Sequence, residues 1–305
     1  DEEATTSPET GLEENATRPE GESDQGETEV SQTVGTGKST QEFFGNVVKG
    51  GDERYEPSKK YEYEQDFTEE QNKFREGYDS KKGNFDEHIA TSIPTFRDNQ
   101  VKKGAAIVKI LEGAENPVVY DLGGSEGSWV KTITEQSGGK IKTINLDPSP
   151  DMKKAFDKNK PDNSEMSLEA FHSGWDDVPT HQPKEKADVV HESMMFQFIE
   201  NGGERKAYID EVADKYLKED GVFITEEKFK MNDDAEYTAN EKLKESHKNK
   251  YYTPEQQSLK SDEVLVGMKE NQANFDQYVK DLKEKFKYVD VYWKAGNFRG
   301  IIATN

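Results

Sequence analysis

The stretch VVYDLGGSEGSW, residues Val118 to Trp129, runs from apolar residues through an acidic residue into a glycine-rich loop. The apolar run at 117–122 is short and bounded by turn-forming residues, which predicts a buried strand. Residues 127–136 then have the spacing of a helix, closed by the glycine pair at 138–139. In α/β sheets, ligands bind beyond the carboxyl ends of the strands, so this first strand-to-helix turn is the predicted binding loop.

The chain on either side of this loop alternates strand-like and helix-like segments. Further strands are predicted at 140–147, 166–174, 187–195 and 221–229, with two more within 288–304, and further helices at 97–113, 148–158 (capped by Ser149), 203–218 and within 232–286. Such alternation favours right-handed crossovers and a mainly parallel sheet. The last two strands are joined by a turn at Gly296 and Asn297, short enough for an antiparallel hairpin. The sequence therefore predicts an α/β fold, a Rossmann-like sheet with helices on both faces.

The N-terminal part differs in composition from the rest of the chain. Residues 1–51 consist mainly of Glu, Thr, Ser, Gly and Gln and carry few large apolar side chains. Such a segment cannot bury enough apolar surface to offset the entropy cost of ordering, which predicts a disordered acidic tail. Residues 52–83 are predicted to be a transitional linker with a short helix near 68–75, and residues 84–305 to be a globular domain. The chain begins at Asp1 without methionine, as expected of a piece processed from a longer protein.

The 305 residues carry a net charge of −22 and no cysteine, which limits the ligands and partners to be expected. Disulfides, thiolate metal sites and cysteine nucleophiles are excluded, and the sequence has no other metal-binding motif. The negative charge disfavours nucleic acid as a partner. No apolar run is long enough to span a membrane and no signal peptide is visible, so a cytoplasmic location is expected.

Three kinds of ligand or chemistry compete for the glycine loop. A dinucleotide requires the spacing G-x-G-x-x-G, whereas the loop reads Gly123-Gly124-Ser125-Glu126-Gly127 and places a carboxylate where phosphates would bind. A serine hydrolase is an alternative, because Gly123, Ser125 and Gly127 fit the G-x-S-x-G nucleophile elbow between a strand and a helix. That elbow normally follows several strands, whereas Ser125 follows the first clear one, and no H-G-G-G-like segment precedes it.

S-adenosylmethionine fits the same residues without these conflicts. It has no phosphate, and its positively charged sulfonium suits the acidic residues Asp121 and Glu126. Glycines such as Gly124 allow the backbone to approach a ligand closely. An acidic residue at the end of the second strand is needed to accept hydrogen bonds from the ribose hydroxyls, and Asp147 is in that position. NAD sites also use such an acidic residue, so the loop decides between the two, and it favours the sulfonium ligand.

The chain resembles the Rossmann-like, class I S-adenosylmethionine-dependent methyltransferases in five stretches: VYDLGGSEGSW, NLDPSPDM, FQFIE…ER, YLKEDGVFITEEKF and GNFRGIIA. More narrowly, it is similar to the carboxy-S-adenosylmethionine synthase branch, which acts before tRNA wobble-uridine modification. That branch has an F-D-E segment and then S-I-P-G-Y, where this chain has NFDEHIATSIPTF at 84–96. The resemblance covers residues 84–304. It implies a seven-stranded sheet with the last strand antiparallel, S-adenosyl-L-methionine as cofactor, and methyl transfer as the activity.

Carried over by position, the resemblance assigns roles to individual residues. It places Gly123, Ser125 and Gly127 in the cofactor loop, Asp147 at the ribose, Trp175 and Asp176 beside the adenine, and Ser193 where the family has an asparagine. Two departures concern the synthase branch: Thr95 and Phe96 replace its glycine and tyrosine, and residues 247–256 carry lysines in place of its carboxylate-binding arginine. They favour an ordinary methyltransferase. A carboxy-S-adenosylmethionine synthase-like enzyme and a non-catalytic binding protein of the same fold stay open as alternatives.

Methyl transfer from a sulfonium is an in-line displacement in which the protein mainly positions the acceptor. A base is needed only where the acceptor must lose a proton. His191, Glu192 and Ser193 stand at the end of the fourth predicted strand, where we expect them to face the same crevice, and they are the candidates for a base or an acceptor-positioning group. The expected acceptor is a small molecule, with a protein side chain as the alternative.

Overall fold

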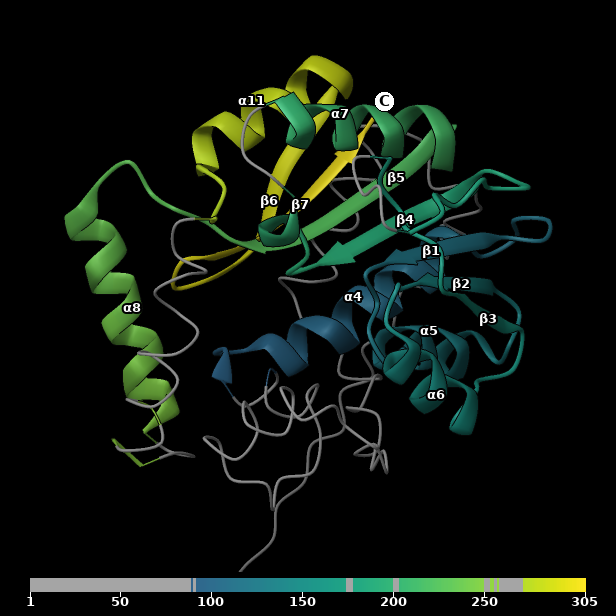
Figure 1. Cartoon of the computed structure of the whole chain (residues 1–305), viewed down its shortest axis with the longest axis horizontal. Coiled ribbons are helices and arrows are strands. Elements are labelled where there is room, and N and C mark those ends of the chain that lie inside the picture. Colours follow the sequence, from purple (N-terminus) through teal and green to yellow (C-terminus); the bar gives the residue numbers. More distant parts are fainter. Residues whose placement is uncertain are drawn as a thin grey trace, which may run out of the picture. The chain divides into compact units, whose positions relative to one another are not determined.

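A computed structural model describes residues 92–173, 178–199, 203–249 and 271–305, together with residues 89, 253, 254 and 257. The predicted tail at 1–51, the linker at 52–83 and the helix near 68–75 lie outside the described residues. A seven-stranded sheet forms the centre of the described part, in the order β3-β2-β1-β4-β5-β7-β6 (Figure 1). The strands are β1 (Val118–Leu122), β2 (Lys142–Leu146), β3 (Ser164–Ser167), β4 (Ala187–Ser193), β5 (Leu217–Lys228), β6 (Tyr288–Ala295) and β7 (Phe298–Thr304).

The sheet pairing confirms the predicted α/β class. β1 pairs in parallel with β2 and β4, and the parallel pairing continues to β3 on one side and to β5 on the other. β7 alone runs antiparallel, to β5 and to β6, and forms the expected hairpin with β6 through the turn at Gly296 and Asn297. All five residues of β1 are buried, as a strand covered on both faces requires.

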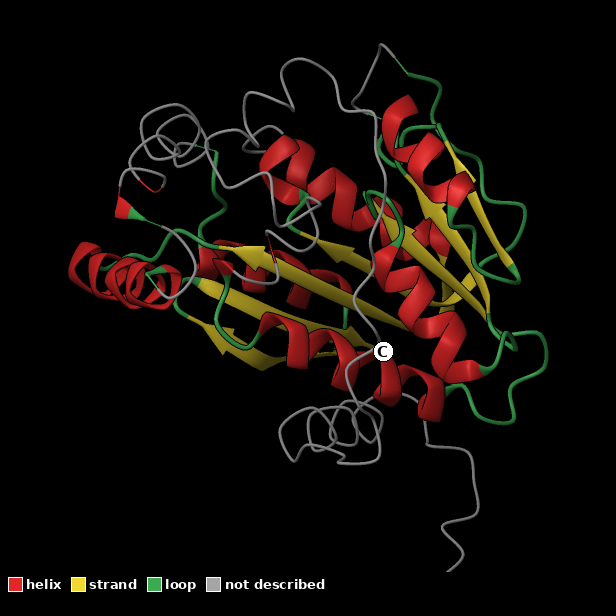
Figure 2. Cartoon of the chain, turned by 90° about the horizontal axis from the view of Figure 1, so that it is seen from below, coloured by secondary structure: helices red, strands yellow, loops and turns green. Residues whose placement is uncertain are grey.

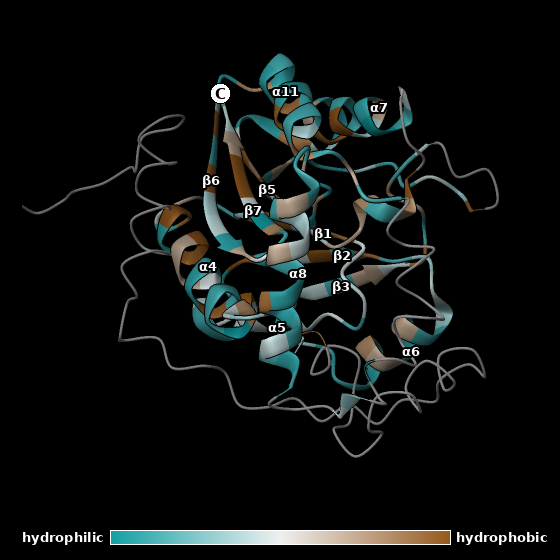
Figure 3. Cartoon of the chain, turned by 90° about the vertical axis from the view of Figure 1, so that its left-hand side faces the viewer, coloured by the Kyte–Doolittle hydropathy of each residue, from teal (hydrophilic) through white to brown (hydrophobic). Residues whose placement is uncertain are grey.

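Helices cover both faces of the sheet (Figure 2). They are α4 (Phe96–Ile110), α5 (Ser128–Ser137), α6 (Pro150–Lys158), α7 (Gly203–Glu211), α8 (Asp234–Lys248) and α11 (Phe275–Lys285). One core cluster joins one face to α7 and α11, and another joins the opposite face to α4 and α5. α4 and α11 each have a hydrophobic and a hydrophilic part, as expected of helices between a sheet and water (Figure 3). Among the described residues, no helix is long and apolar enough to cross a membrane.

Two predicted helix ends are confirmed by their capping geometry. The Ser149 hydroxyl accepts a hydrogen bond from the Met152 amide at the start of α6, with Pro150 in the first turn. α5 ends at Gly138 with φ of 61°, in the left-handed region that glycine adopts without strain.

Two predicted boundaries were wrong. The third strand ends at Ser167 instead of continuing to residue 174, because the Ser167 hydroxyl accepts the Glu169 amide and turns the chain. The helix that starts at residue 203 ends at Glu211, and after one π-helical turn at Val212–Tyr216 the chain enters β5 at Leu217, four residues earlier than predicted. The helical region predicted within 232–286 contains the two described helices α8 and α11, and Asn274 pairs with Lys230 before α11 begins.

Candidate cofactor site

The glycine loop lies where adjacent strands send their helices to opposite faces of the sheet. α5, which follows β1, packs through Trp129 onto the face that carries Val119. α7, which follows β4, packs through Tyr208 onto the face that carries Tyr120. Because β1 and β4 are neighbours, this is the topological switch point of the sheet, the place where α/β folds bind ligands.

The backbone of the loop requires glycine at three positions, for two different reasons. Gly123 and Gly127 have φ of 66° and 84°, and a Cβ on Gly127 would lie 2.5 Å from the Phe156 ring. Gly124 has an ordinary φ, but a Cβ there would lie 2.5 Å from Oδ1 of Asn145 and would also overlap a carboxylate oxygen of Asp121. The loop therefore brings its backbone against polar side chains of β1 and β2, where no side chain fits.

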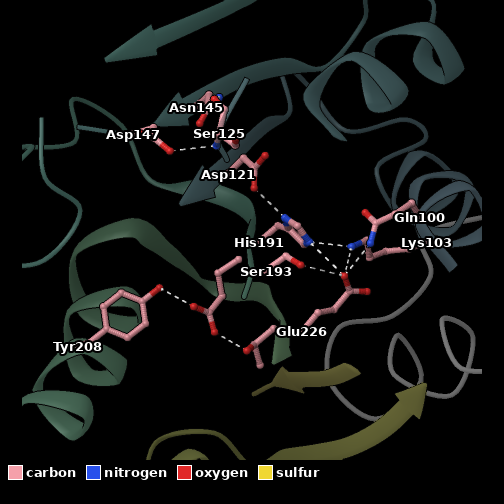
Figure 4. Close-up of polar contacts among 12 residues, drawn as sticks. Gln100, Lys103, Asp121, Ser125, Asn145, Asp147, His191, Ser193, Tyr208 and Glu226 are labelled. Atoms are coloured by element: carbon pink, nitrogen blue, oxygen red, sulfur yellow. Dashed lines mark hydrogen bonds and ion pairs between the residues drawn. The ribbon is translucent and has the colours of Figure 1, made fainter. Parts of the chain in front are cut away.

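Asp147 follows β2 and binds the loop directly. Its Oδ2 accepts a hydrogen bond of 3.0 Å from the Ser125 amide (Figure 4). Its Oδ1 accepts one of 2.9 Å from the Ser149 amide. Burial raises the pKa of Asp147 to about 6, although the two amide hydrogen bonds act in the opposite direction. The structure thus brings together Asp147 and Ser125, which are 22 positions apart in the sequence.

Asp121, the fourth residue of β1, is only 2% exposed. One of its carboxylate oxygens has a hydrogen-bond partner, and the other has none among the described residues. Its Oδ1 lies 2.7 Å from Nδ1 of His191. Its Oδ2, like Oδ1 of Asn145, is buried with no hydrogen-bond partner among the described residues. Both oxygens lie beside Gly124. A buried acceptor without a donor is costly, so this part of the loop favours a ligand that donates hydrogen bonds or carries positive charge.

Lys103 of α4 extends this arrangement on the other side of His191. Its Nζ lies 2.7 Å from Nε2 of His191 and 2.8 Å from Oε2 of Glu226, and its side chain has no exposed surface. Burial lowers the pKa of Lys103, while the Glu226 carboxylate acts to raise it. Burial alone would raise the pKa of Glu226, but the Lys103 ammonium acts in the opposite direction, and that pKa lies well below its usual range. Glu226 also accepts hydrogen bonds from Gln100 and Tyr292, at 2.7 and 2.6 Å.

The expectation that His191, Glu192 and Ser193 face the same crevice was wrong for Glu192. Successive residues of a strand point to opposite faces, and the Glu192 carboxylate lies on the α7 and α11 side. It accepts hydrogen bonds from Tyr208 at 3.3 Å, from Tyr278 at 3.1 Å, and from Thr225. Burial raises its pKa to about 7. Glu192 is fully buried there and does not reach the side of the sheet on which His191 lies.

The other two candidates differ in accessibility. His191 is 1% exposed, stacks on the Trp129 ring at 3.8 Å, and has a neighbour at each ring nitrogen. Ser193 is partly exposed, and its hydroxyl lies 3.5 Å from Glu226. Trp175 and Asp176, expected beside the adenine, lie outside the described residues.

Lys103 and Glu226 were missed by the sequence analysis. Lys103 had no signal in the sequence, because no spacing relates it to His191 and Glu226, which lie 88 and 123 positions away. Glu226 had a weak signal, because it stands near the carboxyl end of a predicted strand. Among the described residues, no cluster of three or more histidine and acidic side chains could hold a metal ion.

Solved structures share this fold, and several are methyltransferases. The plantazolicin methyltransferase BpumL, solved in complex with S-adenosylhomocysteine (SAH), matches with a TM-score of 0.50 at 8% identity over 87% of this chain and 97% of that chain. The likeness establishes the fold. The citrinin polyketide synthase CMeT domain gives 0.47 at 12% identity, and an O-methyltransferase family protein from Burkholderia thailandensis gives 0.43 at 14%.

Those two matches cover 72% and 69% of this chain, and the chain spans 57% and 60% of the length of the matched chains. No protein-family model and no curated protein sequence matches the chain. Nothing in these three neighbours ties the chain to the carboxy-S-adenosylmethionine synthase branch.

Proposed function

We propose that this chain is a methyltransferase that binds S-adenosyl-L-methionine in the glycine loop between β1 and α5. The observation that carries the proposal is the unpartnered Oδ2 of Asp121, buried beside Gly124 at the topological switch point. The cofactor offers what this site lacks: an ammonium group and hydroxyls as donors, and a positive charge. It brings no phosphate, which the carboxylates of Asp121, Glu126 and Asp147 would repel.

The loop residues then take distinct roles in holding the cofactor. Asp147 accepts hydrogen bonds from the ribose hydroxyls, using the lone pairs that the Ser125 and Ser149 amides leave available. Asp121, with Asn145, accepts from the ammonium group. Gly123, Gly124 and Gly127 let the backbone approach the ligand, and Trp175 and Asp176 flank the adenine. When bound, the cofactor supplies a methyl group on a positively charged sulfur, already activated for transfer.

The acceptor is held at the carboxyl ends of β4 and β5, where Ser193 is the accessible member of the three candidate residues. Neither His191 nor Glu192 is placed to remove a proton from an acceptor, since the first has a neighbour at both nitrogens and the second lies on the other face. Rate acceleration therefore comes mainly from positioning the acceptor. We propose a small molecule as the acceptor, a class that includes modified peptides such as the plantazolicin analogues bound by BpumL.

The geometry around Ser125 supports a serine hydrolase less well than it supports a methyltransferase. The Ser125 hydroxyl lies 3.2 Å from the sulfur of Met152, and no described histidine contacts it. His172 and His181 bond to Glu211 and Glu169 instead. A nucleophile elbow needs a histidine within hydrogen-bond reach of the serine.

Isothermal titration calorimetry with S-adenosylmethionine and SAH tests the proposal. We expect binding to the full chain, and at least tenfold weaker binding after Asp147→Ala. Asp162→Ala, which removes an exposed acidic residue beyond α6, is the matched control and should bind as the unmodified chain does. Equal affinity in all three proteins would refute the site assignment.

Turnover separates an enzyme from a binding protein of the same fold. SAH formed from S-adenosylmethionine with an acceptor fraction from a cell extract supports a methyltransferase, whereas binding without SAH formation supports the non-catalytic alternative. Labelling of Ser125 by a fluorophosphonate would contradict the proposal and favour a hydrolase. Formation of carboxy-S-adenosylmethionine in place of SAH would instead indicate the synthase-like alternative.

A further inference from the structure

The contacts of Lys103 extend the cofactor site to a helix that precedes the sheet. Lys103 has no exposed surface, and its Nζ lies between Nε2 of His191 and Oε2 of Glu226. His191 in turn contacts Asp121 through Nδ1. We propose that Lys103 is a positioning residue: acting through His191, it keeps Asp121 ionised and directs the free oxygen of that carboxylate toward the glycine loop. Its effect on cofactor binding rests on the proposed function, whereas its effect on His191 does not.

The hydrogen-bonding capacities of the groups determine where the protons lie. A charged lysine has three donors and no acceptor, so a His191 Nε2 at 2.7 Å from it must accept. A neutral imidazole with an unprotonated Nε2 carries its proton on Nδ1. That proton is donated to Oδ1 of Asp121 at 2.7 Å, which favours the ionised carboxylate. If His191 were protonated at both nitrogens, its Nε2–H would face the Lys103 ammonium, and two donors would meet with no acceptor between them.

Charge balance follows from this proton arrangement. Lys103 neutralises Glu226, with which it forms an ion pair of 2.8 Å, and His191 stays neutral. The negative charge of Asp121 is then uncompensated within the network, and its Oδ2 has no donor among the described residues. A buried uncompensated charge is unfavourable unless a counter-ion arrives, so the network creates a site for a cationic ligand.

Packing holds the network in one orientation. The His191 ring stacks on Trp129 with 3.8 Å between ring centroids and an interplanar angle of 22°, and Nζ of Lys103 lies 5.2 Å from the centroid of Trp129. Trp129 is the second residue of α5 and follows the glycine loop closely. Figure 4 shows Asp121, His191, Lys103 and Glu226 in one continuous series of contacts. The loop is thereby connected to α4 through both β4 and α5.

Nitrogen-15 NMR of the histidine ring nitrogens tests the proposal directly on the full chain. In the unmodified protein, the His191 ring should show a protonated Nδ1 and an unprotonated Nε2. In Lys103→Met this pattern should change, either to the other tautomer or to a doubly protonated ring. In both cases Nε2 would donate to Glu226, whose Oε2 lies 4.0 Å from Nε2 in the unmodified protein. A protonated Nε2 in the unmodified protein would overturn the proposal without any variant, even if Lys103→Met did not fold.

Cofactor affinity gives the second measurement. SAH should bind Lys103→Met about tenfold more weakly or worse, because Asp121 loses its fixed charge and orientation. Lys109→Met, which changes an exposed lysine of the same helix, should match the unmodified protein in both measurements. Reduced stability of Lys103→Met with an unchanged His191 pattern and unchanged SAH affinity would show a merely structural role and overturn the proposal. The expected His191 pattern without any SAH binding to the unmodified protein would instead refute the proposed function.

Discussion

Replacement of Asp147 by asparagine should separate cofactor recognition from fold stability. Each carboxylate oxygen of Asp147 accepts one backbone amide and has a lone pair left for a ribose hydroxyl. Asparagine has a single acceptor oxygen, so at least one hydrogen bond to the charged group is lost, at a cost of about 1.5–3 kcal/mol. SAH should therefore bind Asp147→Asn about 10- to 100-fold more weakly at pH 8.

The pH dependence of binding identifies the carboxylate as the source of this effect. The pKa of Asp147 is raised to about 6, so the ionised form that accepts from the ribose is lost as the pH falls below that value. For the unmodified protein, SAH affinity should fall about fivefold between pH 6 and pH 5, because the ionised fraction of Asp147 falls by that factor. Asp147→Asn cannot titrate at this position and should lack this component of the pH dependence.

Stability should respond differently from affinity. A carboxyl group whose pKa rises on folding from 3.8 to about 6 contributes stability below pH 3.8 that is lost as the pH rises through 6, a loss of about 3 kcal/mol. Asparagine removes that loss but leaves one of the two backbone amides without its acceptor, at about 1–2 kcal/mol. The free energy of unfolding at pH 8 should thus rise by about 1–2 kcal/mol, while affinity falls.

Calorimetric titration at pH 5, 6, 7 and 8, with urea denaturation at the same pH values, measures both quantities. Equal SAH affinity of Asp147→Asn and the unmodified protein at pH 8, or the same pH dependence of both affinities, would refute the role assigned to Asp147. A variant that is unfolded at pH 8 would contradict the stability estimate.

Three further changes have expected outcomes. Gly124→Ala should lower the free energy of unfolding in urea by about 1–3 kcal/mol and weaken SAH binding, because its Cβ would overlap the Asp121 carboxylate; Gly203→Ala, whose Cβ meets open space, is the control and should change neither quantity. In the unmodified protein, the free energy of unfolding should fall by about 3 kcal/mol as the pH rises from 4.5 through 7, because Glu192 ionises while buried; Glu192→Gln should lack this fall. The same dependence of unfolding free energy on pH in both proteins would contradict the pKa assigned to Glu192. Ser125→Ala should leave SAH affinity within about threefold, because the loop contact to Asp147 uses the Ser125 backbone amide; a larger loss would show that the hydroxyl binds the ligand.

The features that the sequence predicted correctly depend on local patterns. The buried apolar run of β1 and the glycines that follow it are contiguous, and Gly123 and Gly127 adopt left-handed φ values that favour glycine. Ser149 caps its helix through a contact three residues away. The place of Asp147 beside the loop followed from one general rule, that parallel neighbouring strands end at the same edge of the sheet.

The features that the sequence could not predict depend on contacts between distant elements. Lys103 is a polar residue in an amphipathic helix, a pattern typical of a solvated side chain, yet the packing of α4 on the sheet places it fully inside. The direction of Glu192 needed the register of β4 to a single residue, because a shift by one reverses the face to which each side chain points. The third strand was predicted too long because hydrophobicity continues past Ser167 to Ala170 and Phe171, which are buried in the core outside β3.

The alternation of side chains along β4 and β5 explains why buried acidic residues occur on both sides of this loop. On the α4 side, Glu226 anchors Lys103 and so acts on Asp121. On the opposite side, the Glu227 carboxylate accepts the amides of Met195 and Phe196, at 2.7 and 2.8 Å.

Those two amides belong to the turn after β4, and this turn reaches the glycine loop itself. A Cβ on Gly123 would lie 2.6 Å from Cγ of Met195, so the Met195 side chain already fills the space beside that glycine. Two consecutive residues of β5, Glu226 and Glu227, thus support the loop from opposite faces of the sheet through different contacts. Loss of either carboxylate should loosen the loop, but only loss of Glu226 should alter the protonation of His191, because Glu227 has no contact with that side of the sheet among the described residues.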